Sequence, residues 1–200
     1  LAKKYLSQST FTRISRIKNR VFGVSWVVPE HVSSKQAEEG LLEILNQFDL
    51  SSVDTILVHS SAAQLARVGL KSSSVIKILE ELILPEGTIL MPSFPFGQSF
   101  YEFIENNPVF KVNRTPSRMG MVTEVFRRSP GVLRSQHPTH PVCAKGKDAQ
   151  WYVSEHHLDE TPFGPHSPFA KLADRGGIVI GLGLQPDFCL TNVHVIEDQL

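Results

Sequence analysis

Short apolar runs alternate with helix-like segments along this chain, and that alternation restricts the fold more than any other feature. The runs 54–59, 88–91 and 178–182 are short, apolar and rich in β-branched residues, as strands are. Apolar residues at helical spacing predict helices at 36–48 and 72–83. This order of elements predicts a layered α/β domain in which helices cover a sheet.

Other segments extend the pattern less strongly. Residues 119–128 and 169–174 are predicted to be helical, the second because it follows Pro168. Residues 132–135 lead into an irregular stretch that contains two prolines, at 137–141.

Composition divides the chain into two parts. With 200 residues, 41% of them hydrophobic, the chain can bury one sizeable core, so we predict a single domain over residues 35–200. Residues 1–28 hold six of the 20 basic residues and none of the 20 acidic ones. We therefore predict a basic, partly helical arm over residues 1–34. It either packs on its own domain or a neighbouring subunit, or lies on an anionic surface.

The sequence predicts a cytoplasmic protein. Its two cysteines show no CxxC spacing, which is typical of a reducing compartment. No apolar run approaches the roughly 20 residues that span a bilayer, and the first residues lack the apolar core of a signal peptide. Basic residues of the body do not interleave with aromatic ones, so we expect no nucleic-acid partner.

The strongest candidate for chemistry follows the last predicted strand. His194 and Glu197 are three residues apart, so on a helix they share one face. A position just past the carboxyl end of a buried strand is where open α/β sheets bind ligands. Histidine titrates near neutral pH and is the commonest general base. A structural His–Glu pair is the alternative interpretation.

Two more segments carry groups suited to an anionic or carbonyl ligand. His59, Ser60 and Ser61 end a strand, where hydroxyls and free N–H groups can hold phosphate, although a plain capped turn remains open. Arg134 and the residues after it combine a fixed cation with polar side chains. A salt bridge beside a loop histidine is the other interpretation there.

Histidine is frequent enough that a metal-dependent hydrolase is a second hypothesis. His137, His140 and His194 would be the ligands. Prolines beside the first two disturb helical periodicity, however, and the sequence has no HExxH motif. We therefore expect no metal.

Taken in order, six short segments resemble the aminoglycoside 3-N-acetyltransferase family, also called the antibiotic acetyltransferases. They are HSS with the strand before it (55–61), GTILMPSF (87–94), TPSRMG (115–120), RSQHP (134–138), FGPHSP (163–168) and TNVHVIE (191–197).

The resemblance implies a three-layer α/β/α fold with a central mixed sheet. It also implies acetyl-CoA as co-substrate and direct acetyl transfer to an amine of an aminoglycoside or amino sugar, with His194 as general base oriented by Glu197. The cofactor side would be formed by residues in four of these segments: His59, Ser60, Ser61, Met119, Gly120, Arg134, Ser135 and His137. We assign His166 and Asp187 to the acceptor side.

Family members usually continue well beyond the His194 segment, so either the given sequence is a fragment or its acceptor site lacks the C-terminal part of the family. A third hypothesis is an inactive relative that acts as a binding module through the basic arm. A homo-oligomer is compatible with each of these interpretations.

Overall fold

The computed structural model of the chain describes residues 32–48, 50, 53–97, 100–106 and 109–198. Residues 1–31 of the predicted basic arm lie outside this set. Within the described residues, no helix has both the length and the apolar character needed to cross a membrane.

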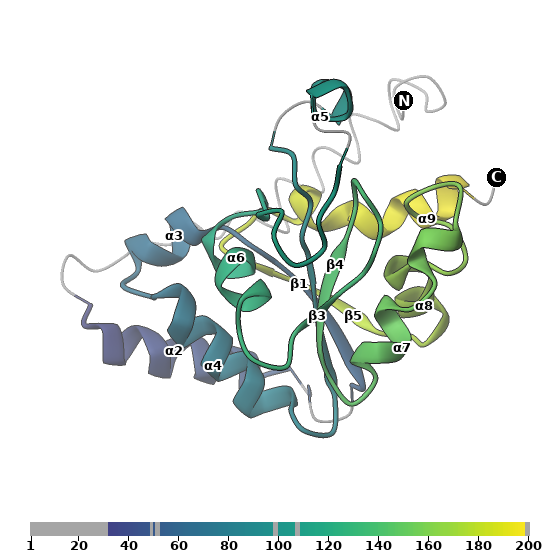
Figure 1. The fold of residues 1–200 in the computed structure, drawn as a ribbon. Helices are drawn as coiled ribbons and strands as arrows, with labels where there is room; N and C mark the ends of the chain where they lie inside the picture. The colour runs from purple at the N-terminus through teal and green to yellow at the C-terminus, as the bar shows by residue number, and fades with distance from the viewer. Residues whose placement is uncertain (1–31, 49, 51–52, 98–99, 107–108, 199–200) are drawn as a thin grey trace, which may run out of the picture. The chain divides into compact units, whose positions relative to one another are not determined.

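A five-stranded mixed sheet forms the centre of the fold (Figure 1). Its strands are β1 (Thr55–Ser60), β2 (Thr88–Pro92), β3 (Leu133–Arg134), β4 (Val142–Gly146) and β5 (Ile178–Leu182), in the order β3-β4-β2-β1-β5. Strand β1 runs parallel to both β2 and β5, whereas β4 runs antiparallel to β2 and β3. The predicted central mixed sheet is confirmed.

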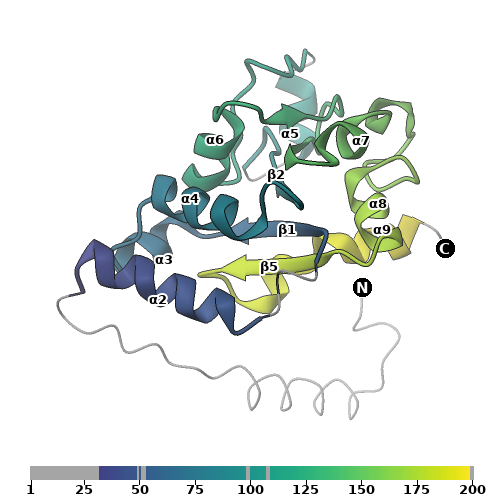
Figure 2. The same cartoon turned by 90° about the horizontal axis from the view of Figure 1, so that it is seen from below.

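Helices cover both faces of this sheet, as Figures 1 and 2 show. One face carries α2 (Ser34–Asn46), α4 (Ser72–Ile83) and α6 (Met121–Arg127), with the short α3 (Ala62–Arg67) beside them. The other face carries α7 (Ala149–Val153) and α8 (Pro168–Asp174), followed along the chain by η4 (Pro186–Asn192) and α9 (Val193–Asp198). The remaining helices are α5 (Phe100–Asn106) and the 3₁₀ turn η3 (His156–Leu158). This is the predicted three-layer arrangement.

Alternation along the central strands explains why two helical layers are needed. In β1, Ile56 and Val58 join the core under α2 and α4, whereas Leu57 between them joins the core under α7 and α8. Successive side chains of a strand point to opposite faces, so an entirely apolar strand must be covered on both sides. All three residues are at most 1% exposed.

The predicted helices form because their ends are signalled in the sequence. Ser33 starts α2 with a capping box: its hydroxyl accepts the Gln36 N–H at 3.3 Å, and its own N–H donates to the Gln36 side chain at 3.0 Å. Helix α4 spans Ser72–Ile83, the predicted range.

Two expectations about strands need correction. We expected the strand before His194 to be buried, but β5 is an edge strand in which Val179 is 37% exposed. Strand β4 was not anticipated at all. Its sequence, Val142–Gly146, contains a lysine and a glycine and has few β-branched residues, so only its pairing with β2 and β3 identifies it.

Candidate active site

The predicted site residues gather where the parallel strands end. Since β1, β2 and β5 run in the same direction, their carboxyl ends lie at one edge of the sheet. His59 and Ser60 end β1, and η4 and α9 follow β5. This edge therefore carries both the HSS segment and the His194 segment.

His194 and Glu197 form the predicted pair on α9. Nδ1 of His194 lies 2.6 Å from Oε2 of Glu197, and the two side chains are 54% and 56% exposed. Val195, between them in sequence, is 3% exposed and anchors the helix in the core under α8. A neutral imidazole that donates its Nδ1 hydrogen to a carboxylate leaves the lone pair on Nε2 available to accept a proton.

The loop before α8 contacts both His194 and the end of α9. The Phe163 ring is 9% exposed, and its centroid lies 5.1 Å from that of His194 and 5.4 Å from that of His140. In the same loop the hydroxyl of Thr161 donates to the carboxylate of Asp198, near the end of α9. The Phe163 ring thus packs against the His194 imidazole and fixes one side of the pair.

Three further histidines form a buried network beneath the site. His156 is fully buried, with Nδ1 2.9 Å from the Ser135 hydroxyl and Nε2 3.0 Å from the Pro162 carbonyl oxygen. The His137 ring stacks on that of His156 at 4.6 Å. Because Nδ1 of His137 accepts the backbone N–H of His140 at 3.1 Å, this ring is in its neutral form with the hydrogen on Nε2.

Burial keeps these imidazoles uncharged near neutral pH. It lowers the pKa of His137 and of His156 to about 4. The pKa of His140 falls to about 3, mainly through burial and further through the charges of His137, His156 and His194. His140 is packed among the rings of Phe94 and Phe163, which provide no counter-charge.

The HSS and TPSRMG segments meet beside the end of β1. Gly120 has φ of +100°, and a Cβ added to it would lie 4.0 Å from the Ser60 carbonyl oxygen. Burial lowers the pKa of His59 to about 4, and its Nε2 has no hydrogen-bond partner among the described residues. Ser61 caps α3 by accepting the Gln64 N–H at 3.4 Å.

Glu124 on α6 holds the TPSRMG loop in place. Its carboxylate accepts the Ser117 N–H at 2.8 Å, and the Ser117 hydroxyl accepts the Met119 N–H at 3.2 Å. Hydrogen bonds from Arg127, and then from Ser117 and Arg128, lower the pKa of Glu124 to about 2, against a smaller opposing effect of burial. The loop is therefore fixed by a permanently charged anchor.

Comparison with known proteins identifies the family. Residues 57–200 match the model of the aminoglycoside 3-N-acetyltransferase family. The chain is 31% identical over 186 residues to the SPbeta prophage-derived aminoglycoside N(3')-acetyltransferase-like protein YokD of Bacillus subtilis, covering 85% of this chain and 68% of that protein. The chain belongs to the aminoglycoside 3-N-acetyltransferase family.

Solved structures of the family share this fold. The crystal structure of YokD from Bacillus subtilis aligns with 82% of this chain. The alignment covers 70% of the YokD chain, at 31% identity and a TM-score of 0.69. A binary complex of AAC-IIIb with CoASH aligns with 84% of this chain. The alignment covers 65% of the AAC-IIIb chain, at 28% identity and a TM-score of 0.67.

The sequence covers only part of the length of its relatives. It spans 59% of aminoglycoside N(3)-acetyltransferase VIII of Streptomyces fradiae, to which it is 28% identical over 170 residues. Statements about the activity of a whole acetyltransferase are therefore proposals for this chain.

Within this family framework, the predicted cofactor residues divide into two groups. His59, Ser60, Ser61, Met119 and Gly120 lie together at the end of β1, as described above. The other group, Arg134, Ser135 and His137, is engaged by the protein itself, and its contact with a cofactor stays a prediction.

Arg134 is committed to the backbone. Its Nη1 donates to the Thr115 and Val112 carbonyl oxygens at 2.5 and 3.1 Å, and its Nη2 donates to that of Ser93 at 2.5 Å. The side chain also lies over the Phe110 ring, at 4.8 Å from the centroid. Sequence reasoning expected an anion or acidic side chain as its partner, whereas three carbonyls fill that role.

The two residues assigned to the acceptor side lie on separate elements. His166 is paired with a buried carboxylate: its Nδ1 is 2.7 Å from Oδ1 of Asp159, whose side chain is 2% exposed. Asp187 lies in the first turn of η4, on the path from β5 to His194. Their contact with an acceptor stays a prediction.

The residues of the metal hypothesis do not form a ligand set. Among the side chains that the structure describes, no group of three or more His, Cys, Asp and Glu residues could hold a metal ion. Nδ1 of His137 accepts backbone N–H groups, and Nδ1 of His140 lies 2.9 Å from the Thr139 hydroxyl. No observation favours the hydrolase over the transferase.

Sequence reasoning missed one group at the site, Phe163. Its segment, FGPHSP, is one of the six that resemble the family, but contact with His194 depends on how the loop folds back against α9. The signal that could have found it is the position of an aromatic residue directly before Gly164-Pro165, a turn that fixes the direction of the side chain before it.

Proposed function

We propose that this protein is an acetyl-CoA-dependent N-acetyltransferase that acts on an amine of an aminoglycoside or amino sugar. Family membership supports the reaction class. The observation that carries the proposal for this chain is the 2.6 Å contact between His194 Nδ1 and Glu197, on a ring that is half exposed. That geometry leaves a basic nitrogen facing away from the carboxylate, where a substrate amine can reach it.

In this proposal His194 handles the proton that the reaction releases. An alkyl amine is protonated at neutral pH and becomes a nucleophile only once its nitrogen lone pair is free. The ammonium group first releases one proton to solvent, and Nε2 of His194 then takes a second proton from the attacking nitrogen as the new C–N bond forms. The leaving thiolate then receives that proton, so an amide and a free thiol result. Glu197 holds the ring in the tautomer this requires and stabilises the imidazolium.

Acetyl-CoA would supply the acetyl group as a thioester, and the HSS and TPSRMG segments are suited to hold it. Gly120 presents no side chain where its loop approaches Ser60, so backbone groups of both segments stay accessible at this edge. Nε2 of His59 is buried without a partner among the described residues, a polar atom that a bound molecule could satisfy. The complex of the relative AAC-IIIb with CoASH supports acetyl-CoA as the co-substrate.

The names of related structures support an aminoglycoside acceptor. A complex of AAC-VIa with sisomicin aligns with 83% of this chain. The alignment covers 64% of the AAC-VIa chain, at 28% identity and a TM-score of 0.67. Acidic residues lie beside His194 on the same segment, Glu197 and Asp198, and suit a substrate that carries several ammonium groups.

Thiol release tests this function directly. Acetyl-CoA is incubated with the protein and a panel of aminoglycosides and amino sugars, and free thiol is measured. We expect release above the rate without amine for at least one member of the panel, and its loss in His194→Ala. Release that is equal in the variant would reject the role of His194, and absence of release with every amine would reject the reaction.

Three predictions that accompany this proposal have no test in the structure. The cytoplasmic location and a homo-oligomeric state both stay predictions, as does the absence of a nucleic-acid partner. The binding-module hypothesis rests on residues 1–31, which lie outside the described part of the chain.

A further inference from the structure

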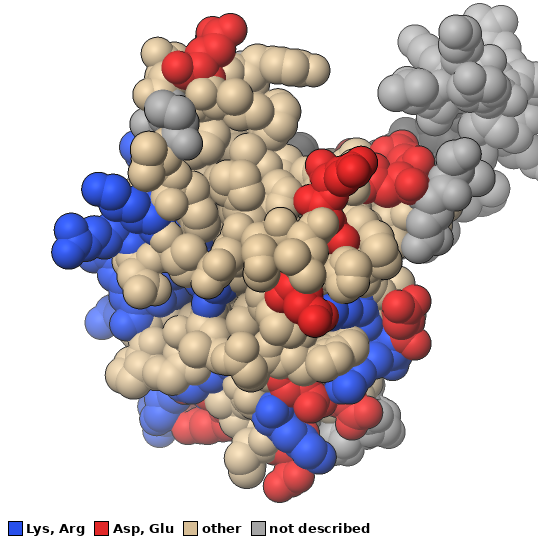
Figure 3. All heavy atoms as spheres, turned by 45° about the vertical axis from the view of Figure 1, so that its right-hand side comes forward, with Lys and Arg blue, Asp and Glu red and all other residues tan. Residues whose placement is uncertain are grey.

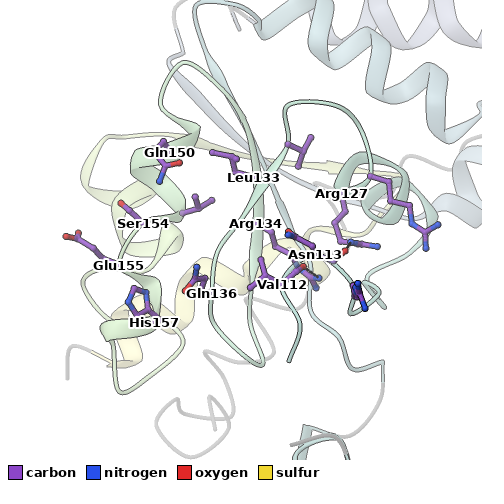
Figure 4. Close-up of a pocket in the computed structure, with 14 residues that line it drawn as sticks. Val112, Asn113, Arg127, Leu133, Arg134, Gln136, Gln150, Ser154, Glu155 and His157 are labelled. Atoms are coloured by element: carbon purple, nitrogen blue, oxygen red, sulfur yellow. Dashed lines mark hydrogen bonds between the residues drawn. The ribbon is translucent and has the colours of Figure 1, made fainter. Parts of the chain in front are cut away.

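A large cavity opens along the edge strand β3, and neither His194 nor Glu197 lines it. Its volume is about 1130 Å³, slightly above the usual range of roughly 300–1,000 Å³ for small-molecule sites. One wall comes from residues 112–114 and the end of α6, and the opposite wall from α7 and η3, with β3 between them (Figure 4). The space is sufficient for a molecule of nucleotide size.

The lining is strongly basic. It contains four arginines and one carboxylate, Glu155. Glu124, just outside the lining, pairs with Arg127 and Arg128 at 2.8 and 2.7 Å and offsets one more positive charge. A net positive charge remains. Figure 3 shows a group of Lys and Arg at the left of that view, whereas Asp and Glu are spread over the top, centre, right and bottom of the same face.

Two of the arginines form a rigid part of the wall. Every nitrogen of the Arg127 guanidinium donates a bond, two to Glu124 and one to the Asn113 carbonyl oxygen, and the side chain is 7% exposed. Arg134 is 8% exposed and is held by the carbonyl oxygens described above, yet its Nε is buried without a partner among the described residues. A buried donor left unpaired is costly unless a ligand or water meets it.

The other two arginines retain free donors. Arg128 uses only Nε on Glu124, so both of its terminal nitrogens stay available among the described residues. The exposed guanidinium of Arg114 makes no interaction with the described part of the chain. The amide side chains of Gln136 and Gln150 add neutral donors to the same cavity. Fixed positive charge thus lies beside donors that can adjust to a ligand.

We propose that this cavity binds a phosphate ester carried by a molecule of nucleotide size. Guanidinium groups pair with phosphate oxygens through two parallel hydrogen bonds, and a phosphate monoester has enough oxygens and charge for several arginines at once. A single carboxylate could satisfy only one of them. The phosphate is either the 3′-phosphate of acetyl-CoA or a phosphate of a separate nucleotide. The first case rests on the proposed function, and the second does not.

Binding of adenosine 3′,5′-bisphosphate tests the site. Its dissociation constant is measured by calorimetry on the full chain, with adenosine as the uncharged probe. In Arg114→Gln/Arg128→Gln we expect binding at least about tenfold weaker, since each lost charge-assisted bond is worth about that factor. Arg67→Gln, which removes an exposed arginine from α3, should bind as the wild type does. Equal affinity in the double variant, equal affinity for adenosine, or no binding to the wild type would overturn the proposal.

The source of the phosphate is distinguished by coenzyme A and dephospho-coenzyme A, which lacks the 3′-phosphate. If the coenzyme is the source, the wild type prefers coenzyme A and the double variant loses that preference. If the preference is unchanged while bisphosphate binding falls, the ligand is a separate nucleotide. Both outcomes support a phosphate site. Failure of acetyl transfer in the thiol assay would reject the proposed function and leave the bisphosphate result standing.

Discussion

Histidines occupy two contrasting settings in this molecule. His194 lies on a short helix at the sheet edge, half exposed, with a carboxylate 2.6 Å from one ring nitrogen. His156 is fully buried and is hydrogen-bonded to a hydroxyl and a carbonyl oxygen. The first ring thus has a carboxylate as its hydrogen-bond partner, whereas the second has only neutral partners.

The difference shows that the surroundings, and not the residue type, separate a group for proton transfer from a structural one. Burial lowers the pKa of His137 and His156 to about 4, so these rings neither gain nor release protons near neutral pH. Their hydrogen bonds instead connect the RSQHP segment to η3 and its following loop, the loop that also carries Phe163. The buried histidines thus help to hold in place the loop that contacts His194.

The largest effect should come from removing the exposed imidazole. His194→Ala is expected to lower the turnover number by about 10²- to 10⁴-fold, the usual contribution of a general base. Coenzyme binding and the free energy of unfolding should change little, because the ring is half exposed. Steady-state thiol release and coenzyme titration check this. Added imidazole should restore part of the rate, and loss of coenzyme binding together with turnover would point to a structural role instead.

Acid should act on the buried histidines. The pKa values of His137, His140 and His156 are about 4, 3 and 4 in the folded state and about 6.5 when unfolded. Between those values the unfolded chain binds more protons, so stability is full above about pH 6.5 and falls as the pH falls towards about 4. Between pH 6.5 and 4.5 we expect each ring to contribute a loss of at most about 3 kcal/mol, at about 1.4 kcal/mol per pKa unit.

Urea unfolding at a series of pH values measures this loss. The range from pH 6.5 to 4.5 isolates the imidazoles, because the carboxyl of Glu124, with its pKa near 2, loses its stabilising effect only below about 4.5. His140→Asn should flatten the slope in this range. Stability that stays constant between pH 6.5 and 4.5 in the wild type would show that these rings are not held neutral.

Removing a buried imidazole should mainly lower the stability of the fold, whereas removing His194 should mainly lower the turnover number. His156→Ala leaves a cavity, removes one of the two partners of the Ser135 hydroxyl and unpairs the Pro162 carbonyl oxygen, so we expect about 2–4 kcal/mol of destabilisation. His157→Ala, the exposed neighbour, should change stability by no more than about 0.5 kcal/mol. Chemical denaturation of the two variants makes the comparison. Equal stabilities would mean that the buried ring contributes no packing.

Much of the fold could be predicted because local signals and burial agree. Ser33 and Gln36 form the capping box that starts α2, and the apolar runs in β1 and β2 required cover on both faces. Strand β4 could not be predicted, because Val142–Gly146 becomes a strand only through pairing with β2. Non-local pairing of that kind leaves little trace in a short sequence window.

At the site, spacing predicted the contact that lies within one helix. His194 and Glu197 meet because residues three apart share a helical face. Arg134 suited an anion by residue type, but its partners are carbonyl oxygens of residues 19 to 41 positions away, which no local pattern announces. Phe163 likewise reaches His194 across a fold that only the tertiary structure defines.

The smallest expected effect separates the charge of the carboxylate from its position. Glu197→Gln can still accept the Nδ1 hydrogen of His194 through its amide oxygen, but it no longer stabilises the imidazolium by charge, so we expect about a tenfold lower turnover number. Glu160→Gln removes the same charge from an exposed residue of the adjoining loop and should leave turnover unchanged. A Glu197→Gln loss as large as that of His194→Ala would mean that the amide fixes the wrong tautomer, and the role of Glu197 would then be orientation above all. If the turnover number of Glu197→Gln were unchanged, the partner of His194 would have no role in the reaction. The pair would then be structural, like the hydrogen bonds of His156.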